Sequence, residues 1–551
     1  MNYRVILGFL GLTSALVGAA MLLSTPWSWR VCSVDPNEAR GVRALLITGF
    51  GSILLGGALA LCGRGANVER FYRRDAIASV TLCWILAILL GAIPFLLAEV
   101  QRAPATPMSL VDALFESTSG ITTTGATVIS DLENRDAIPR VIVFWRGMTH
   151  FLGGLGVVCL YVAFLGHGVG GKAAMQVENS GALDQSFTTM RSYAFSMCAL
   201  YAALTALCII ALSFCGASLF DSFIHSFSVT SLGGFSNYNS SVGHFMHDPR
   251  VNYVAVEYVL AFFMALASMN HALLWTLVLG KPSKLWHDTE TRWFLSLLLV
   301  ATIALTTAGM LKGDFNVQFK TKPHPLEVTD LSTLSPELTA SHEDVTLPPR
   351  YRASDAFRCS LFHVLSLWTG AGIATTTYEN WNSAAIILLV ALMFCGGCTG
   401  SPSGGVKVFR VILVLKSLSQ GLRRYFRPNV VRAMRLDNQI VPPDRVLAAL
   451  GYIVTLAFFV LVTAILVNFI EPDTIWDARG VSSMEKLIDL TSGSLAMHAN
   501  VGLGLGALGS CGNYGQLTVV TKLIFSWAML LGRLEIWAVL ALLTPDFWRR
   551  S

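Results

Sequence analysis

The chain is poor in charged residues. Asp, Glu, Lys and Arg make up 13% of its 551 residues, whereas an ordinary soluble protein has about 25%. Hydrophobic residues make up 54%, and the mean hydropathy is +0.59. This balance excludes an ordinary soluble protein and predicts an integral membrane protein. Because tandem membrane helices form one body, the length does not predict several separate domains.

Motifs of nucleotide-binding proteins are also missing. No Gly-x-Gly-x-x-Gly loop follows a strand, and there is no Walker motif, so we expect this chain itself to bind no nucleotide. The histidines lack a metal-ligand spacing such as His-Glu-x-x-His. His150, His363 and His498 lie near polar turns and are expected to pack or to form hydrogen bonds.

The eleven cysteines show no disulfide framework. Most lie in apolar stretches, where a thiol behaves as a small hydrophobic group. Cys395 and Cys398 have the spacing of half a zinc site or of a redox pair. No second pair accompanies them, which favours close packing. An intramembrane enzyme that uses these two cysteines is the alternative, and the absence of an acid–base–nucleophile motif disfavours it.

Long apolar runs are what the sequence has instead. Ten of them are long enough, at about 20 residues, to span a membrane: 5–24, 43–62, 77–98, 141–165, 194–215, 254–279, 294–311, 384–415 (interrupted), 446–469 and 519–543. The first run also resembles a signal peptide, since Arg4 precedes it and small residues end it. Its length, and the second run that follows soon after, favour a membrane span.

Charges alternate between the connections. Basic residues fill one set: Arg64, Arg70, Arg73, Arg74, Lys281, Lys284, Arg292, Arg423, Arg424, Arg427, Arg432, Arg435, Arg549 and Arg550. By the positive-inside rule these connections are cytoplasmic. Acidic residues fill the intervening loops, which should face outward: Asp131, Glu133, Asp136, Glu327, Asp330, Glu337, Glu471, Asp473 and Asp477. Because the basic clusters adjoin spans, we expect membrane lipid or a cytoplasmic partner, and no nucleic acid.

Four short segments rich in Gly, Thr and Ser recur between the apolar runs. They are 122–126 (TTTGA), 231–236 (SLGGFS), 369–375 (TGAGIAT) and 499–504 (ANVGLG). Such turns at membrane depth must be buried in protein or line a wet cavity. A shorter, less apolar segment precedes each one, over 110–119, 220–230, 356–368 and 484–498. Each of these segments suits a half-helix that enters from outside and stops partway.

The glycines of the four turns recur at similar intervals. Gly125, Gly234, Gly372 and Gly502 are 109, 138 and 130 positions apart, which indicates tandem repetition. The sequence therefore predicts an all-α membrane protein with four helix–half-helix–helix units around one central pore. Its parts are two N-terminal helices (1–70) and the units 71–175, 176–285, 286–440 and 441–551. The third unit contains an irregular outward loop (313–352) and an interrupted helix (396–405).

The chemistry of the four turns fits a cation filter. A half-helix directs its negative dipole end at a cation, and glycine permits backbone angles that present several carbonyls inward. Four such turns could replace the water shell of a potassium ion. The alternative is simple helix breaking, which four similar turns disfavour. The predicted filter residues are Thr123, Thr124, Gly125, Leu232, Gly233, Gly234, Ala371, Gly372, Asn500, Val501 and Gly502.

Four longer motifs resemble those of bacterial Trk-type potassium uptake proteins. They are 115–127 (FESTSGITTTGAT), 145–156 (WRGMTHFLGGLG), 395–407 (CGGCTGSPSGGVK), and 531–537 (LGRLEIW) together with 544–548 (TPDFW). The resemblance covers all four units and the two leading spans. The third turn departs from the family by having Trp368 and Ala371 near its glycine, where Thr is usual. The fourth has no Thr.

The resemblance implies potassium uptake across the bacterial inner membrane, as a symporter or a channel. It also implies a homodimer that docks a cytoplasmic TrkA-like regulatory protein, which binds NAD or ATP. Relatives that pass sodium often carry Ser in place of the first filter glycine, so Gly125 favours potassium. A sodium-permeable or sodium-coupled relative of the same fold is the alternative.

The resemblance further implies a gate inside the membrane, at residues 396–405. Its predicted residues are Gly396, Gly397, Gly400, Gly404, Gly405, Lys407 and Arg533. A plain kink is the alternative for this break. A charge such as Arg533 inside an apolar helix is expensive and usually functional. Its motif position places it below the filter as a barrier to cations. The alternatives are a pair with Glu535 or a side chain that extends to the membrane surface.

Glu116 and Arg146 also lie near membrane depth. Glu116 falls on the first half-helix, and Arg146 follows the first filter segment. We expect them to form a buried ion pair that holds the filter in place.

Overall fold

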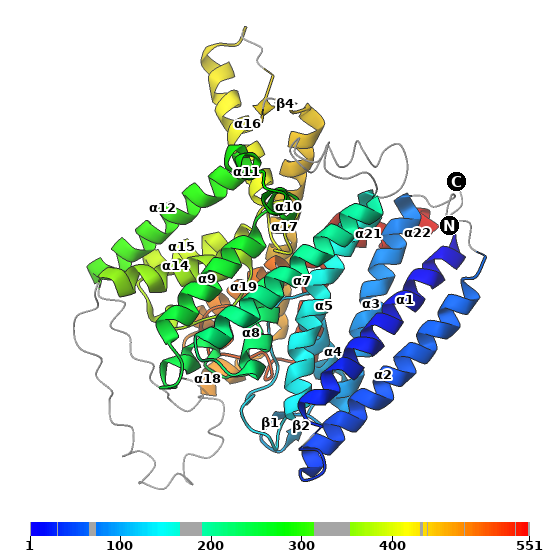
Figure 1. The fold of residues 1–551 in the computed structure, drawn as a ribbon. Coiled ribbons are helices and arrows are strands. Elements are labelled where there is room, and N and C mark those ends of the chain that lie inside the picture. Colours follow the sequence, from blue (N-terminus) through cyan, green and yellow to red (C-terminus); the bar gives the residue numbers. More distant parts are fainter. Residues whose placement is uncertain are drawn as a thin grey trace.

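A computed structural model describes residues 2–29, 31–65, 73–165, 190–312, 353–429, 433–437, 439–478, 480–534 and 536–548. These residues are mostly helical (Figure 1). Helices satisfy their own backbone groups, which a membrane interior requires. Two short antiparallel pairs of strands accompany them: β1 (Gln101–Ala103) with β2 (Thr106–Pro107), and β3 (Arg435–Leu436) with β4 (Gln439–Ile440).

Two N-terminal helices, α1 (Tyr3–Ser24) and α2 (Pro36–Cys62), form a close antiparallel hairpin. Small residues make the close approach possible. A methyl group added to Gly11 would lie 2.7 Å from the backbone oxygen of Gly56. Helix α2 begins at a Pro, and the side chain of Asp35 caps it by accepting a hydrogen bond from the Asn37 amide at 2.8 Å.

The remaining long helices follow a recurring order of helix, short helix and helix. The first set is α3 (Arg73–Leu97), α4 (Leu110–Ile121) and α5 (Arg140–Leu165), and the second is α7 (Met190–Phe214), α8 (Leu219–Ser231), α9 (Tyr253–Ser268) and α10 (His271–Val278). The third is α12 (Thr289–Lys312), α14 (Ala353–Thr369), α15 (Ser383–Phe394) and α16 (Val408–Phe426). The fourth is α17 (Pro443–Ile470), α19 (Ser483–Ala499), α20 (Val519–Arg533) and α21 (Ile536–Leu543).

Shorter elements complete the described chain. They are the helices α11 (Pro282–His287), α18 (Thr474–Ala478) and α22 (Pro545–Trp548), and the 3₁₀ turns η1 (Thr25–Trp27), η3 (Ser241–Met246), η5 (Tyr378–Asn380) and η6 (Gly506–Leu508). Each predicted apolar run contains a helix. The expected outward loop at 313–352 lies outside the described residues, as do Arg70, Arg432 and Glu535.

Within the residues that the structure describes, six helices are long and apolar enough to cross a membrane, namely α1, α2, α3, α7, α12 and α17. Two further pairs pass the same test together but are bent, α9 with α10 by 106° and α20 with α21 by 116°. The apolar runs predicted over 254–279 and 519–543 therefore each form a bent pair of helices. At the first bend, the side chain of Asn270 starts a new helix by accepting a hydrogen bond from the Ala272 amide at 2.9 Å.

The predicted charge asymmetry matches the arrangement of the elements. Helices α11 and α16 lie at the same end of the molecule as both termini, whereas β1, β2 and α18 lie at the opposite end (Figure 1). Arg423 and Arg424 fall in the last turn of α16. Asp131 lies beside β1, because the preceding Ser130 amide donates to the Arg102 oxygen at 2.8 Å. The basic end is therefore the expected cytoplasmic side.

Candidate functional site: four glycine turns and the loop beside them

The four turns follow the short helices α4, α8, α14 and α19, and left-handed residues stop two of these helices. Leu232 ends α8 with a φ of 56°, and Asn500 ends α19 with a φ of 53°. Non-glycine residues seldom adopt this conformation. At the other end of α4, Ser109 and Asp112 form a capping box. The helices therefore begin and end at fixed residues, which sets where each turn begins.

The glycines of the first three turns lie against the next turn in sequence order. All four turn glycines have positive φ, +85° at Gly125, +91° at Gly234, +54° at Gly372 and +78° at Gly502. A methyl group added to Gly125 would lie 2.2 Å from the Gly233 oxygen. One added to Gly234 would lie 3.0 Å from the oxygens of both Ala371 and Gly372.

The fourth turn closes this series into a ring. A methyl group added to Gly372 would lie 2.0 Å from the Val501 oxygen, and one added to Gly502 would lie 2.2 Å from the Thr124 oxygen. The structure thus brings together backbone from all four predicted filter segments. The carbonyls nearest the neighbouring glycines belong to Thr124, Gly233 and Val501, each directly before its own turn's glycine, and in the third turn to Ala371 and Gly372 equally.

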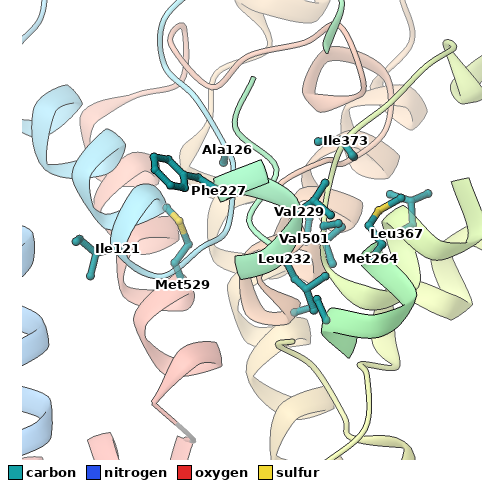
Figure 2. Packing of buried hydrophobic residues seen from close by; sticks show 14 of the residues in the cluster. Ile121, Ala126, Phe227, Val229, Leu232, Met264, Leu367, Ile373, Val501 and Met529 are labelled. Atoms are coloured by element: carbon teal, nitrogen blue, oxygen red, sulfur yellow. The ribbon is translucent and has the colours of Figure 1, made fainter. Parts of the chain in front are cut away.

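Side chains of the turns hold the ring from behind. Asn500 donates its amide to the Thr124 hydroxyl and to the Met529 oxygen, both at 2.9 Å, and so links the fourth turn to the first. Thr123 is fully buried and has a φ of 50°. Leu232 and Val501 belong to one packed apolar cluster with Val229 (Figure 2). Their side chains therefore pack in the interior behind the backbone.

The predicted pair of Glu116 and Arg146 is confirmed. Arg146 Nε lies 2.6 Å from Glu116 Oε1, and both side chains are buried. Arg146 also donates to the Ser236 oxygen at 3.0 Å, and Glu116 accepts from the Val128 amide at 3.0 Å. Because these bonds reach residues beyond the first and second glycines, the pair ties the two turns together. A buried pair with such additional hydrogen bonds is strongly held.

The histidines make hydrogen bonds, as predicted. His150 Nδ1 lies 2.8 Å from the Gly120 oxygen, and its Nε2 accepts from the Phe235 amide at 3.0 Å. His150 therefore bridges the first short helix to the second turn. Nδ1 of His363 lies 2.9 Å from the Cys359 oxygen, and that of His498 lies 2.9 Å from the Ser494 oxygen.

The predicted break at 396–405 is a closed loop between α15 and α16, so the alternative of a plain kink is wrong. The two ends of the loop, which form its neck, are joined by two backbone hydrogen bonds. The Gly396 amide donates to the Val406 oxygen at 2.7 Å, and the Val406 amide donates to the Phe394 oxygen at 3.2 Å. Inside the loop, Lys407 Nζ donates to the oxygens of Ser401 and Ser403.

The loop lies directly against the fourth turn. A methyl group added to Gly404 would lie 2.3 Å from the Ala499 oxygen. One added to Gly370 would lie 3.3 Å from the Asn500 oxygen and 3.9 Å from the Gly404 nitrogen. Glycines at these positions allow the loop to touch the base of two turns.

Contacts with neighbouring helices fix the other side of the loop. The Cys398 amide donates to the Ser268 oxygen at 2.8 Å, where α9 ends. A methyl group added to Gly397 would lie 2.8 Å from the same Ser268 oxygen, and one added to Gly400 would lie 3.2 Å from Asn270 Oδ1. The bend between α9 and α10 therefore seats the loop. Cys398 is fully buried, which fits the packing role favoured for it.

Arg533 reaches the loop from the end of α20. Its guanidinium donates to the Pro402 oxygen and, at 3.5 Å, to the Gly153 oxygen of α5. The side chain is buried, so it does not extend to the membrane surface as one alternative had it. The bond to Pro402 ties the guanidinium to the predicted gate.

Sequence reasoning missed Glu290, which anchors the loop. This buried carboxylate at the start of α12 accepts bonds from the Thr399 amide at 2.7 Å, the Thr399 hydroxyl at 3.1 Å and the Phe409 amide at 3.0 Å. An acid that opens an apolar run was the available signal, because a buried charge there needs partners. Its partners were not predictable, since they lie more than 100 residues away.

This arrangement, helices of membrane length around four joined glycine turns, defines a multi-span membrane transport protein. The sequence model of TrkH, described as a cation transport protein, matches residues 43–548. The chain belongs to the TrkH family of cation transport proteins, and it is a transport protein rather than an enzyme.

Individual relatives match over most or all of the chain. The Trk system potassium uptake protein TrkH of Halomonas elongata is 31% identical over 558 residues, and that of Escherichia coli K12 is 30% identical over 554, each with full coverage of both chains. The Trk system potassium uptake protein TrkG of E. coli K12 is 30% identical and covers 86% of each chain. The crystal structure of the potassium transporter TrkH from Vibrio parahaemolyticus superposes with a TM-score of 0.78, at 26% identity and full coverage of both chains.

Proposed function

We propose that this protein takes up potassium ions across the bacterial inner membrane through a filter lined by backbone carbonyls. The closed ring of four glycine turns is the observation that carries the proposal. Carbonyl oxygens of Thr124, Gly233, Ala371 and Val501 would replace water around the ion. The potassium uptake activity named for the relatives agrees with this assignment.

The experiment that tests the proposal is potassium uptake in cells that lack their own potassium systems. Expression of this chain should restore growth at low external potassium, and excess sodium should compete weakly. Equal competition by sodium would instead support a sodium-permeable relative. The retained Gly125 disfavours that alternative, because relatives that pass sodium often carry Ser at this position.

We further propose that the loop from Gly396 to Gly405 is the gate. Its contacts with Ala499, with Ser268 and with Arg533 support this role, because they place a closed loop against the base of the filter turns. Lys407 stabilises the closed form from within. Arg533 would add an electrostatic barrier to cations beside the loop.

The partners proposed for the chain are a second copy of itself and a cytoplasmic TrkA-like regulatory protein. The word system in the names of the relatives supports a multi-component assembly. The basic residues Arg423 and Arg424 lie at the end of α16, on the side expected to be cytoplasmic (Figure 1). Binding of NAD or ATP to the partner would control the loop. Co-purification of the two proteins, with and without nucleotide, tests this assignment.

A further inference from the structure

The fourth turn lacks supports that its own short helix gives to the second and third turns. Six residues before the turn glycine, Ser228 donates to the Phe235 oxygen at 2.6 Å, and Ser366 donates to the Ile373 oxygen at 2.5 Å. The corresponding position in the fourth unit is Ala496, which has no hydroxyl.

The position nine residues before the glycine shows the same contrast. His225 lies 3.2 Å from the Ser236 hydroxyl, and His363 lies 3.4 Å from the Thr376 hydroxyl. In the first unit this position is Glu116, which accepts a hydrogen bond from the Val128 amide, just after the first turn. In the fourth it is Gly493, which has no side chain to bond with.

Two tyrosines from outside α19 bond to the fourth turn instead. The Tyr514 hydroxyl donates to the Gly502 oxygen at 3.0 Å, and the Tyr378 hydroxyl donates to the Gly504 oxygen at 2.8 Å. Both tyrosines are almost fully buried. We propose that Tyr514 and Tyr378 are positioning residues that fix the backbone of the fourth filter turn and thereby set ion selectivity.

The geometry explains how a hydroxyl behind the turn controls the carbonyl in front of it. The Val501 oxygen lies toward Gly372 in the ring, whereas the next carbonyl, that of Gly502, is held by Tyr514. A peptide plane that rotates carries its oxygen with it, and Gly502 has the rotational freedom of a glycine. The bond to Tyr514 therefore keeps the Gly502 oxygen away from the ring and the Val501 oxygen in it.

Both tyrosines are themselves held by other units. The Tyr514 amide donates to the Thr127 oxygen, just after the first turn, at 2.8 Å, and its ring packs against Phe115 with a centroid distance of 5.7 Å. Tyr378 follows the third turn, and its ring lies 6.0 Å from that of His363. Contacts from the first and third units therefore help to position Gly502 and Gly504, whereas the helix α19 supports the chain just beyond them, where Ser492 accepts from the Leu505 amide at 3.0 Å.

This inference rests on the proposed potassium filter, and a phenylalanine series tests it. Tyr514→Phe and Tyr378→Phe remove only the hydroxyls. Tyr201→Phe is the matched control, because its buried hydroxyl donates to the Phe151 oxygen of helix α5 at 3.2 Å, outside the turns. Potassium and sodium uptake are measured at equal membrane protein levels, together with the thermal stability of each purified protein in potassium and in sodium.

Loss of one buried hydrogen bond should lower the ratio of potassium to sodium uptake roughly fivefold in Tyr514→Phe. Tyr378→Phe should lower it less, because Gly504 lies two residues beyond Gly502. The difference in thermal stability between potassium and sodium should decrease together with the uptake ratio. Tyr201→Phe should match the parent in both measurements. An unchanged ratio in both turn variants, or an equal loss in the control, overturns the inference. A parent protein with no potassium preference would overturn the proposed function instead.

Discussion

At the scale of single residues, the ring depends on the absence of side chains at four positions. Each turn glycine combines positive φ with a neighbouring carbonyl where a Cβ would be, so any other residue there is strained and crowded at once. A side chain added to a helix glycine that faces open space causes neither strain nor a clash. The difference lies in the backbone of an adjacent turn, which cannot move without distorting its own carbonyls.

Gly125→Ser should lower the preference for potassium over sodium by about tenfold, as strain of 1–3 kcal/mol at such a position would allow. The new Cβ would lie 2.2 Å from the Gly233 oxygen, so the carbonyl ring must shift. Gly451→Ser on α17 is the control, because no atom lies within 4 Å of its added Cβ. Uptake ratios of both ions measure the effect. An unchanged ratio at a normal protein level would refute the assignment of Gly125.

Arg533→Ala and Arg533→Gln should raise potassium flux and leave selectivity intact. A like charge roughly 6 Å away costs about 3 kcal/mol at an effective dielectric of about 20, and water in the cavity reduces this. Both variants also remove the guanidinium bond to the Pro402 oxygen. Loss of this bond loosens the loop and should raise the potassium flux as well. Arg533→Lys keeps the charge and should stay close to the parent. If all three variants lose flux, Arg533 is a structural anchor and the barrier is disproved.

At the scale of elements, the loop between α15 and α16 is held shut by three groups of contacts: its own neck, the bend after α9 and the carboxylate of Glu290. Its glycines alone would leave it mobile. The anchors turn it into an ordered element that can occupy one place against the filter turns.

Deletion within the loop from Gly396 to Gly405 should raise resting potassium flux and weaken control by the regulatory partner. The part removed would no longer lie against Ala499 at the base of the fourth turn. Flux in the presence and absence of the partner measures both effects. Reduced flux in a folded, membrane-inserted deletion would show that the loop supports the filter instead.

Glu290→Ala should release the loop and raise resting flux several-fold. The buried Thr399 amide and the half-buried Phe409 amide would lose their acceptor, at a cost of about 1–3 kcal/mol for the buried group and less for the other. Glu290→Gln keeps an acceptor oxygen and should have a smaller effect. Glu485→Gln, at an exposed position in α19, is the control. A Glu290→Ala protein with parental resting flux and a normal protein level would show that the carboxylate does not latch the loop.

At the scale of the whole molecule, local sequence patterns predicted the four turns, the short helices before them and the interruption near 400. Those features depend on glycine, on short-range polarity and on the length of apolar runs. The bend before Asn270, the anchor at Glu290 and the supports at Tyr378 and Tyr514 were missed. Glu290 and Tyr378 depend on partners far away in sequence, and Tyr378 meets Gly504 across 126 positions. Asn270 bonds to Ala272 and Tyr514 to Gly502 over shorter separations, but no sequence motif marks either contact.

Contacts between units also close the molecule on itself. Lys522 in α20 donates to Asp112 at the start of α4 at 2.6 Å, across 410 positions of sequence. Both side chains are buried, at 2% and 3% exposure. Arg358 and Glu257 form a similar pair between the third and second units. These pairs join helices that no short-range pattern relates, so the four units could be predicted from the sequence but the ion pairs that join them could not.

Lys522→Met should therefore destabilise the whole protein by about 3 kcal/mol, because it leaves Asp112 buried without its cation. The Arg102 guanidinium lies 3.9 Å from the other carboxylate oxygen of Asp112 and compensates part of its charge. The loss of unfolding free energy should therefore lie toward the lower end of the range for a broken buried pair. The double variant Lys522→Met with Asp112→Asn removes both charges and should recover much of the loss. Arg250→Ala breaks an exposed pair with Asp248, which water and salt screen, and should leave the stability close to that of the parent. Thermal unfolding in detergent measures all three, and equal effects for Lys522→Met and Arg250→Ala would show that the closing pair contributes no more than a surface contact.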